Sequence, residues 1–459
     1  MPEINNPESE IIVKVNDRSS GKRTRSKTKT PDKPESPRRN DPYILGIYAL
    51  LLIISVIELF SASSTEVSAT NIYGPLVRHC IFLGLGFAIV MAFMNTHYYV
   101  FRKLAPFLAI LSLLLLAFST FKGVEINGAQ RAIKIGTFTL QPPEIVKLTV
   151  IILLSDILAK NLIRGDVNNK GVTLAAIVVL IFGGLLYSNG LTNLILLMGA
   201  SLCMFLLSGM KTKKIGIVVL IYAVCGGAML MIKSSSKSSD EFDNIGKADT
   251  AYEMVQKDEL DNNISLGRRG DTWVGRIKRH LKGVHPGDTI DDMNRQVIFA
   301  KFALARGGVV GNGPGNSRES SRLPLAFSDY IYSIVVEDTG LVGGVALIIL
   351  YLCLLLRAGR IASKCSRPFP ALLIMGCAIL IVFQALVHMA IVTGVFPVSG
   401  QPLPLISKGG TSILVTSIAF GIMLSVSRFA VRTGSKKQII REEINALPEE
   451  LSSENPTQL

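Results

Sequence analysis

Long apolar segments, separated by shorter polar ones, fill the chain from residue 43 to residue 429. Apolar runs of about 18 or more residues need lipid or a very large core around them. A transmembrane β-barrel would instead show short segments of alternating polarity. We therefore predict an all-α, polytopic membrane protein. About ten transmembrane helices fit the pattern, over residues 43–60, 76–94, 104–120, 144–159, 172–186, 191–207, 215–232, 329–356, 371–393 and 412–429.

The basic residues indicate how these helices are oriented. Lys and Arg are enriched in the cytoplasmic connections of membrane proteins. In this chain they gather in alternate connections, as that rule requires if the N-terminus lies inside. Since ten is an even number, we expect both termini in the cytoplasm. The basic residues on the expected inside are Arg102, Lys103, Lys160, Arg164, Lys211, Lys213, Lys214, Arg357, Arg360, Lys364, Arg367, Arg428, Arg432, Lys436 and Lys437.

Polar segments flank and interrupt the membrane domain, which we place at residues 43–434. Residues 1–42 are basic, rich in Ser, Thr and Pro, and lack the apolar core of a signal peptide, so we expect a disordered cytoplasmic tail. Residues 435–459 are a second polar, cytoplasmic tail. A large extracytoplasmic loop, residues 234–325, separates the seventh and eighth spans, and residues 234–262 within it look like a flexible insertion.

The composition agrees with a membrane protein. The chain of 459 residues is 49% hydrophobic and 18% charged, with a mean hydropathy of +0.42, whereas soluble proteins carry about 25% charged residues. The formal net charge of +14 does not indicate nucleic-acid binding, because the bases cluster at the ends of apolar runs. The six cysteines lack metal-ligand spacing and read as small apolar side chains.

The first candidate site lies in residues 126–148, INGAQRAIKIGTFTLQPPEIVKL. The QPP triplet is a helix-start signal, which puts Glu144 in the first turn of a span. Lys147 follows three residues later, so the two side chains can pair on one helix face. One interpretation is a structural ion pair. The other, with Arg131 just before the membrane, is a basic rim that binds a phosphate at the outer leaflet.

The second candidate site lies in residues 321–344, SRLPLAFSDYIYSIVVEDTGLVGG. Asp329 stands at the outward start of a long apolar span, and carboxylates beside hydrocarbon are costly unless they pair, bind a cation or face water. Its carboxylate suits three roles: a helix N-cap, a general base, or a metal ligand beside a pyrophosphate. For Glu337 and Asp338, about two turns deeper, we expect a buried structural pair with a basic partner.

The long outside loop holds a basic cluster around the only tryptophan of the chain, Trp273. Such a cluster is typical of an interfacial membrane anchor, or of an amphipathic segment that guides an anionic lipid headgroup. The glycine-rich run 307–315 lacks the Lys-Ser/Thr ending of a P-loop, so we reject nucleotide binding there. The cluster comprises Arg268, Arg269, Arg276, Lys278 and Arg279.

The most unusual segment is residues 396–410, FPVSGQPLPLISKGG, which holds three prolines and three glycines between two long apolar runs. Non-helical backbone at membrane depth is tolerated only where protein buries it or water lines it. We expect a re-entrant or surface loop that roofs a cavity. On the preceding span, we expect His388 to serve packing or hydrogen bonding rather than ligand binding.

Three long motifs resemble the SEDS family, the FtsW, RodA and SpoVE proteins of bacterial cell-wall synthesis. Residues 396–428 are similar to the family signature PVTG-x-PLPFIS-x-GGSS, and residues 127–148 to NGA-x-RW…QPSE…K. Residues 295–344 are similar to Q-x-x-x-A…GG-x-x-G-x-G…TDFIF…EE-x-G. The motifs occur in the right order, and the resemblance covers about residues 43–430. The basic N-terminal extension, with GQPLPLIS and GGTS, looks more like the FtsW (division) branch than RodA (elongation).

The resemblance implies a peptidoglycan glycosyltransferase that polymerises lipid II during septal cell-wall synthesis in cell division. It implies a place in the bacterial inner membrane at the division site, with a class B penicillin-binding transpeptidase and other divisome membrane proteins as partners, and no nucleic acid. The catalytic Asp of the family falls on Asp329, where we also expect a divalent cation, Mg²⁺ or Mn²⁺. The expected substrate-binding residues are Arg131, Glu144, Lys147, Arg268, Arg276, Gln296, Pro402, Pro404, Ser407, Gly409 and Gly410.

The chain departs from the family pattern at four positions: Ala132 replaces Trp, Pro143 replaces Ser, Asn189 replaces Asp, and Asp338 replaces Glu. Two other functions stay open. An intramembrane charged cavity would also suit a lipid II flippase, and a non-catalytic divisome scaffold is the third alternative. A transporter needs access from both leaflets, whereas the polar groups here crowd the outer side, which favours the enzyme.

Overall fold

The structure is a computed structural model, and every residue that it describes lies in one compact unit, Arg39–Leu459. The two predicted tails, apart from residues 40–42, and the insertion at 234–262 lie outside the described residues. The structure describes residues 40–63, 74–122, 124–126, 129–135, 138–163, 165–224, 226, 273–283, 290, 294–323 and 326–430.

Helices occupy all ten predicted spans, as far as the described residues cover them. Within the described ranges, seven helices are long and apolar enough to cross a membrane, namely α1, α2, α3, α5, α11, α12 and α13. The other three predicted spans differ from these seven. Helix α4 carries charges at both ends, and α6 is a shorter apolar helix. The seventh predicted span is helical over residues 212–224. The bounds are α1 Pro42–Ser63, α2 Gly74–Met94, α3 Tyr99–Lys122, α4 Pro142–Lys160, α5 Asn169–Asn189, α6 Leu191–Leu207, α9 Trp273–Lys282, α10 Arg295–Gly307, α11 Ile331–Ala362, α12 Pro368–Val392 and α13 Gly410–Phe429, with a 3₁₀ turn η1 at Glu319–Ser321. The chain is therefore a polytopic helical membrane protein, as predicted.

Two small antiparallel sheets add to the helices. Strands β1 (Val124–Ile126), β2 (Ala129–Ile135) and β3 (Phe138–Leu140) form a meander where the sequence predicted only a loop. Its register sets Ile126 opposite Ala129, and Ile135 opposite Phe138. A two-stranded pair, β4 (Leu162–Ile163) and β5 (Asp166–Val167), lies between α4 and α5. Strands of two to seven residues give too short an alternating pattern to recognise among long apolar runs.

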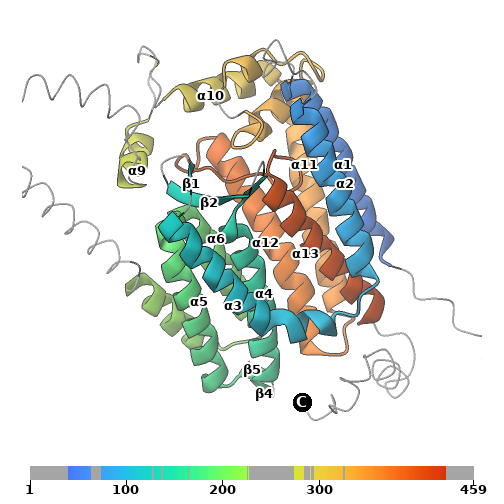
Figure 1. Cartoon of the computed structure of the whole chain (residues 1–459), viewed down its shortest axis with the longest axis vertical. Helices are drawn as coiled ribbons and strands as arrows, with labels where there is room; N and C mark the ends of the chain where they lie inside the picture. The colour runs from blue at the N-terminus through green and yellow to red at the C-terminus, as the bar shows by residue number, and fades with distance from the viewer. Residues whose placement is uncertain are drawn as a thin grey trace, which may run out of the picture. The chain divides into compact units, whose positions relative to one another are not determined.

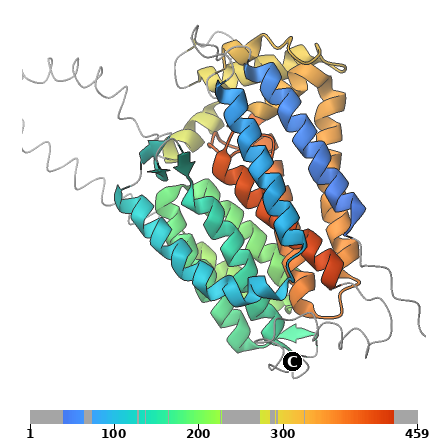
Figure 2. The same ribbon diagram turned by 45° about the vertical axis from the view of Figure 1, so that its right-hand side comes forward.

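Helices α12 and α13 form the interior of the bundle (Figures 1 and 2). In each of them, 78% of the apolar window is buried inside the protein, against 22% in α2 and α3. Helix α12 packs on α4, α6, α11 and α13, and α13 packs along α2. Helices buried on most sides read as apolar nearly all round, which explains why the sequence shows no amphipathic period there.

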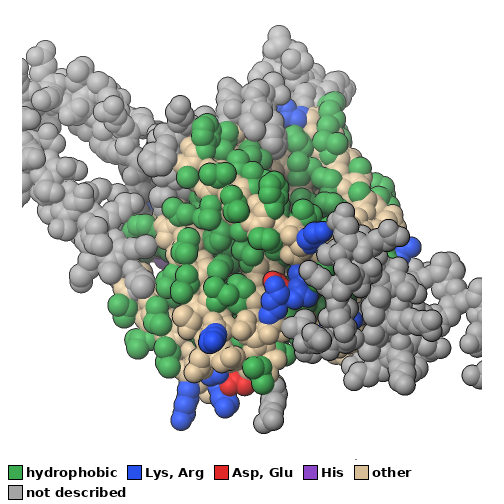
Figure 3. All heavy atoms as spheres, turned by 60° about the horizontal axis from the view of Figure 1, so that its bottom comes forward, with side chains coloured by type: hydrophobic (Ala, Val, Ile, Leu, Met, Phe, Trp, Pro, Cys, Tyr) green, Lys and Arg blue, Asp and Glu red, His purple; other side chains and the backbone are tan. Residues whose placement is uncertain are grey.

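Ion pairs join helix ends that we expect on the cytoplasmic side. Arg102 at the start of α3 pairs with Asp156 near the end of α4, at 2.6 Å, and Arg357 near the end of α11 pairs with Asp41 at 2.6 Å. Figure 3 brings this lower end of Figure 1 forward and shows Lys and Arg side chains beside broad apolar areas. The helix ends that the charge rule groups together are therefore neighbours in the fold.

Helix α11 is broken near its start. Gly340 has φ 71° and ψ −174°, so the carbonyls before it and the N–H groups after it lose their helical partners. The glycine-rich segment 307–313 supplies the missing partners through backbone hydrogen bonds. This segment has a structural role, in keeping with our rejection of a P-loop. The bonds are Asn312 N–H to Glu337 O (3.0 Å), Gly313 N–H to Asp338 O (2.8 Å), Leu341 N–H to Gly308 O (3.0 Å) and Val342 N–H to Val309 O (3.2 Å).

Candidate active site

Residues 396–410, here called the proline segment, connect α12 to α13, and residues 401–407 of it are buried. Side chains from surrounding helices satisfy its carbonyls. Gln384 Nε2 donates to Pro402 O at 3.2 Å, and Tyr351 Oη donates to Pro404 O at 2.6 Å. Ser55 Oγ donates to Ile406 O at 3.3 Å. Protein groups thus replace the water that an irregular backbone would otherwise need in a membrane.

Further contacts fix the conformation of the proline segment around Gln401. His388 lies with Nδ1 2.7 Å from Gln401 O, as expected of a hydrogen-bonding residue, and Gln401 Nε2 donates to Asn193 Oδ1 at 3.1 Å. Leu405 has φ 66° and is the only non-glycine residue with positive φ among the described residues. Such a conformation costs about 1–3 kcal/mol and persists only where the surroundings impose it, most often at functional sites.

Asp329 is attached to this segment through its neighbours in the chain. Ser407 Oγ donates to Ser328 O at 2.7 Å, and Lys408 N–H donates to Phe327 O at 2.9 Å. Ser328 Oγ in turn donates to Asp329 Oδ1 at 3.0 Å. The Asp329 side chain stays partly exposed, whereas Ser407 is buried. The proline segment therefore presents this carboxylate at the edge of the buried core.

Asp329 is not the helix cap that one interpretation allowed. The N-cap of α11 is Tyr330, and no side chain caps that end of the helix. The Tyr330 side chain is buried, and the charges of Asp329 and Arg276 both lie close enough to act on its phenol.

Arg276 reaches this region from α9, a short helix with basic residues along it. Its Nη1 donates to Val398 O at 3.1 Å, which links α9 to the proline segment. Lys408 brings a second cation to this part of the chain. Its Nζ lies 5.2 Å from the centre of the ring of Phe327, which precedes Asp329 by two residues. The sequence analysis did not single out Lys408, which follows Ser407 in the family motif at a position where the motif leaves the residue open. Two cations and one carboxylate suit acid–base chemistry beside an anionic group.

Glu144 and Lys147 form the predicted ion pair one turn inside α4. The start of α4 at Pro142, the position of Glu144 in the first turn and the pairing distance of 2.8 Å confirm the sequence expectation. Both side chains are buried, and Lys147 is fully inaccessible. Lys147 Nζ also donates to Gln384 Oε1 at 2.9 Å, and Gln384 holds Pro402. The pair therefore contacts the proline segment through Gln384, and its predicted role in substrate binding stays a prediction.

The other predicted substrate residues are spread around this centre. Gln296 lies in the first turn of α10, partly exposed, while Gly409 and Gly410 begin α13. Arg131 lies in β2, and its side chain is outside the described part, as is the whole of Arg268. The sheet containing β2 reaches α13 where Thr411 Oγ1 donates to Thr139 O at 2.9 Å. The direct substrate contact expected of these residues stays a prediction.

The prediction of a basic partner for Glu337 and Asp338 is wrong, as far as the described part of the chain shows: neither carboxylate forms an ion pair there. Asp338 accepts hydrogen bonds from the hydroxyls of Ser61 and Ser317. Glu337 Oε1 accepts from the backbone N–H of Arg318 at 2.9 Å. Both carboxylates are buried. Hydroxyl and backbone donors here take the place of a counter-charge, while Glu337 Oε2 has no hydrogen-bond partner among the described residues. No sequence signal reveals such partners.

The described residues build no metal site of their own, since no group of three or more His, Cys, Asp and Glu gathers among them. Mg²⁺ usually keeps one or two carboxylates and takes its other ligands from water and substrate phosphates. Asp329, a single partly exposed carboxylate, fits that mode of binding.

Fold and site together define a polytopic helical membrane protein with a carboxylate and cations presented by a buried, non-helical segment. A family model described as "Cell cycle protein", for FtsW, RodA and SpoVE, matches residues 42–252 and 272–432. The chain belongs to this family.

Relatives of known name agree with this assignment. A probable peptidoglycan glycosyltransferase FtsW of Geobacter metallireducens is 30% identical over 85% of this chain and 95% of its own length. Stage V sporulation protein E of Bacillus subtilis and peptidoglycan glycosyltransferase MrdB of Escherichia coli are each 26% identical, over 85% and 84% of this chain and 97% and 93% of their own lengths.

Solved structures share the fold. RodA of Thermus thermophilus, a rod shape determining protein, has a TM-score of 0.57 at 22% identity, over 86% of this chain and 98% of that one. A chain of a peptidoglycan synthase complex that couples polymerization and crosslinking has a TM-score of 0.62 at 24% identity, over 86% of this chain and 99% of that one.

Proposed function

We propose that this protein is a peptidoglycan glycosyltransferase that polymerises lipid II into glycan strands for the septal wall. The observation that carries the proposal is the proline segment, because one buried element contacts the neighbours of Asp329, the Arg276 guanidinium and the Glu144–Lys147 network. The names of the relatives support the reaction type.

The reaction needs a base beside the hydroxyl of the acceptor sugar and a cation beside the leaving pyrophosphate of the donor sugar. The hydroxyl oxygen of one chain attacks the anomeric carbon of the other, a carbon–oxygen bond forms, and the bond to the pyrophosphate breaks. Asp329 accepts the hydroxyl proton, since it is the partly exposed carboxylate at this site. Arg276 offsets the charge that develops on the pyrophosphate. In the alternative role, Asp329 would hold Mg²⁺ or Mn²⁺, which would supply charge stabilisation at the pyrophosphate.

Glu144 and Lys147 act as positioning residues. Both side chains are buried, and Lys147 orients Gln384, which holds the carbonyl of Pro402. A buried, fully hydrogen-bonded pair gives a rigid support for an irregular backbone.

The cellular setting follows from the same assignment. We place the protein at the division site of the inner membrane, with a class B penicillin-binding transpeptidase as partner, in the FtsW branch. The similarity to a chain of a peptidoglycan synthase complex supports a partner of that kind.

A lipid II flippase is the main alternative. The test uses purified full chain with its transpeptidase partner, in liposomes carrying labelled lipid II. The proposal expects glycan strands on a denaturing gel and no translocation of label by the chain alone. Translocation without strand formation would support the flippase, and neither activity, with the complex intact, would support a scaffold.

A further inference from the structure

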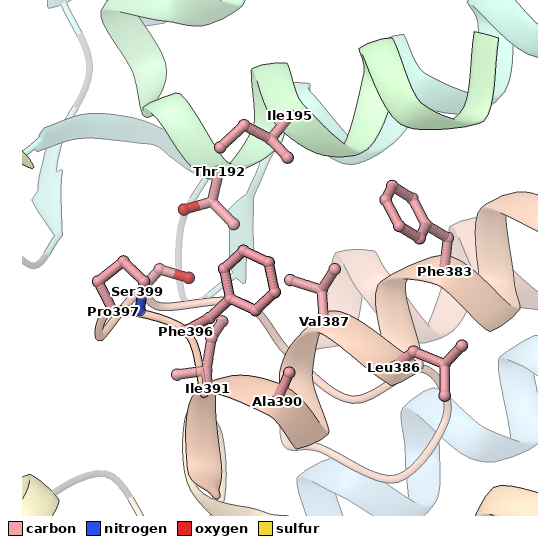
Figure 4. Close-up of a pocket in the computed structure, with 10 residues that line it drawn as sticks. All are labelled: Thr192, Ile195, Phe383, Leu386, Val387, Ala390, Ile391, Phe396, Pro397 and Ser399. Atoms are coloured by element: carbon pink, nitrogen blue, oxygen red, sulfur yellow. The ribbon is translucent and has the colours of Figure 1, made fainter. Parts of the chain in front are cut away.

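Beside the proline segment lies an apolar hollow of about 220 Å³, between α6 and α12 (Figure 4). Ile195 of α6 and Phe383, Leu386 and Val387 of α12 form its apolar wall. On one side of the hollow the two helices touch at Gly199, which has no side chain. A Cβ there would lie 2.2 Å from the Phe383 ring. The hollow therefore has a fixed wall where α6 and α12 touch.

The opposite side is open. Leu386 is 36% exposed, and it is the one exposed residue of α12 among positions 381–390. Phe396 is 44% exposed and directs its ring toward the space between the helices (Figure 4). Since α12 is a membrane-spanning helix, apolar side chains exposed here face lipid or a lipid-like ligand.

One end of the hollow is polar. Thr192 and Ser399 line it, and the buried Ser399 hydroxyl has no hydrogen-bond partner among the described residues. Between Pro397 and Ser399, which both line the hollow, the carbonyl of Val398 accepts the hydrogen bond from Arg276. A guanidinium thus stands one residue away from an apolar hollow that opens toward the bilayer.

We propose that this hollow holds the first isoprenoid units of a polyprenyl pyrophosphate, with the pyrophosphate at Arg276. The inference rests on the proposed function, and it adds the subsite for the lipid tail. Apolar, methyl-branched isoprenoid units suit an apolar hollow between helices, and the change from apolar wall to cation matches a molecule that is apolar except at one anionic end. An acyl chain of an ordinary phospholipid is the competing occupant.

The test uses the full chain in phosphatidylcholine nanodiscs and an undecaprenyl pyrophosphate with a diazirine in its first isoprenoid units. We expect labels on peptides of α6 and α12 that line the hollow. A tenfold excess of unlabelled undecaprenyl pyrophosphate should reduce the labelling about tenfold, because it competes for the same site with the same affinity, whereas the same excess of phosphatidylglycerol should not. Labels elsewhere, or equal competition by phosphatidylglycerol, would overturn the proposal.

A matched pair of variants gives a functional readout. Ala390→Phe fills the hollow, while Ala371→Phe places the same side chain elsewhere on α12. We expect A390F to raise the KM for lipid II about tenfold with little change in kcat, because a tail contact is uniform binding. A371F should match wild type, and equal KM values in all three proteins would contradict the subsite.

The labelling experiment on the wild-type protein does not depend on whether the variants fold. Wild type that is labelled but makes no strands would refute the proposed function and leave the subsite standing.

Discussion

At the scale of single residues, a few buried side chains hold the backbone that presents Asp329. Ser407 shows this most clearly: its hydroxyl accepts a hydrogen bond from Leu403 N–H at 2.7 Å and donates to Ser328 O at 2.7 Å. It thereby connects the proline segment to the residue before the proposed catalytic carboxylate.

Replacing Ser407 with Ala should therefore weaken both stability and activity. It leaves a buried N–H and a carbonyl without partners, at a cost of about 1–3 kcal/mol. Thermal unfolding in detergent and strand formation from lipid II measure the two effects. The matched control is Ser363→Ala, since the hydroxyl of Ser363 bonds to Arg360 O within an exposed helix end, with no other partner among the described residues. Wild-type behaviour of S407A would show that Asp329 is held by other contacts.

Lys147 tests the buried network in another way. Lys147→Met leaves Glu144 buried without its cation, which costs about 3–5 kcal/mol when one partner of a buried pair is removed. The double variant with Glu144→Gln removes the unpaired charge and should recover much of that loss. Thermal unfolding of the four proteins in a double-mutant cycle measures the coupling. Additive losses in the two single variants would contradict a coupled pair.

The sequence predicted the local part of this network and not the distant part. Glu144 and Lys147 lie three residues apart on one helix, so their spacing alone predicts the pair. The contacts of Gln384 with Pro402 and of Tyr351 with Pro404 join residues 18 and 53 positions apart. In helices that are apolar all round, the pattern does not fix which face turns toward which neighbour.

At the scale of elements, the break in α11 depends on glycines. A Cβ on Gly311 would lie 2.3 Å from Asp338 O and 2.5 Å from Gly340 N, and Gly311 also has φ +86°. The sequence showed the glycine run, and family resemblance marked it, but only the fold reveals that it caps both sides of a helix break.

Gly311→Ala should therefore destabilise the protein. The left-handed backbone costs an alanine about 1–2 kcal/mol, and the clash with backbone atoms adds about 1–3 kcal/mol. Gly216→Ala is the control, since nothing lies within 4 Å of its added Cβ. Thermal unfolding in detergent compares the two. A G311A protein as stable as G216A would mean that the segment can move away from α11 without loss.

At the scale of the whole molecule, the account depends on which side of the membrane the site faces. The charge pattern places α9 outside and the start of α5 inside, and labelling of introduced cysteines tests this. With a membrane-impermeant maleimide on intact spheroplasts, Leu281→Cys, 79% exposed in α9, should react. Lys170→Cys, exposed at the start of α5, should react only after permeabilisation. The reverse pattern would turn the site toward the cytosol and exclude polymerisation outside.

The most direct test of the central claim is the rate of strand formation by Asp329→Asn, in purified full chain assembled with its transpeptidase partner. Loss of a general base lowers rates by about 10²–10⁴-fold, and we expect a loss in that range with the complex intact. The matched control is Asp166→Asn, whose carboxylate pairs with Lys214 at 2.9 Å on the opposite side; it should polymerise at the wild-type rate. Unchanged polymerisation by D329N would contradict the account.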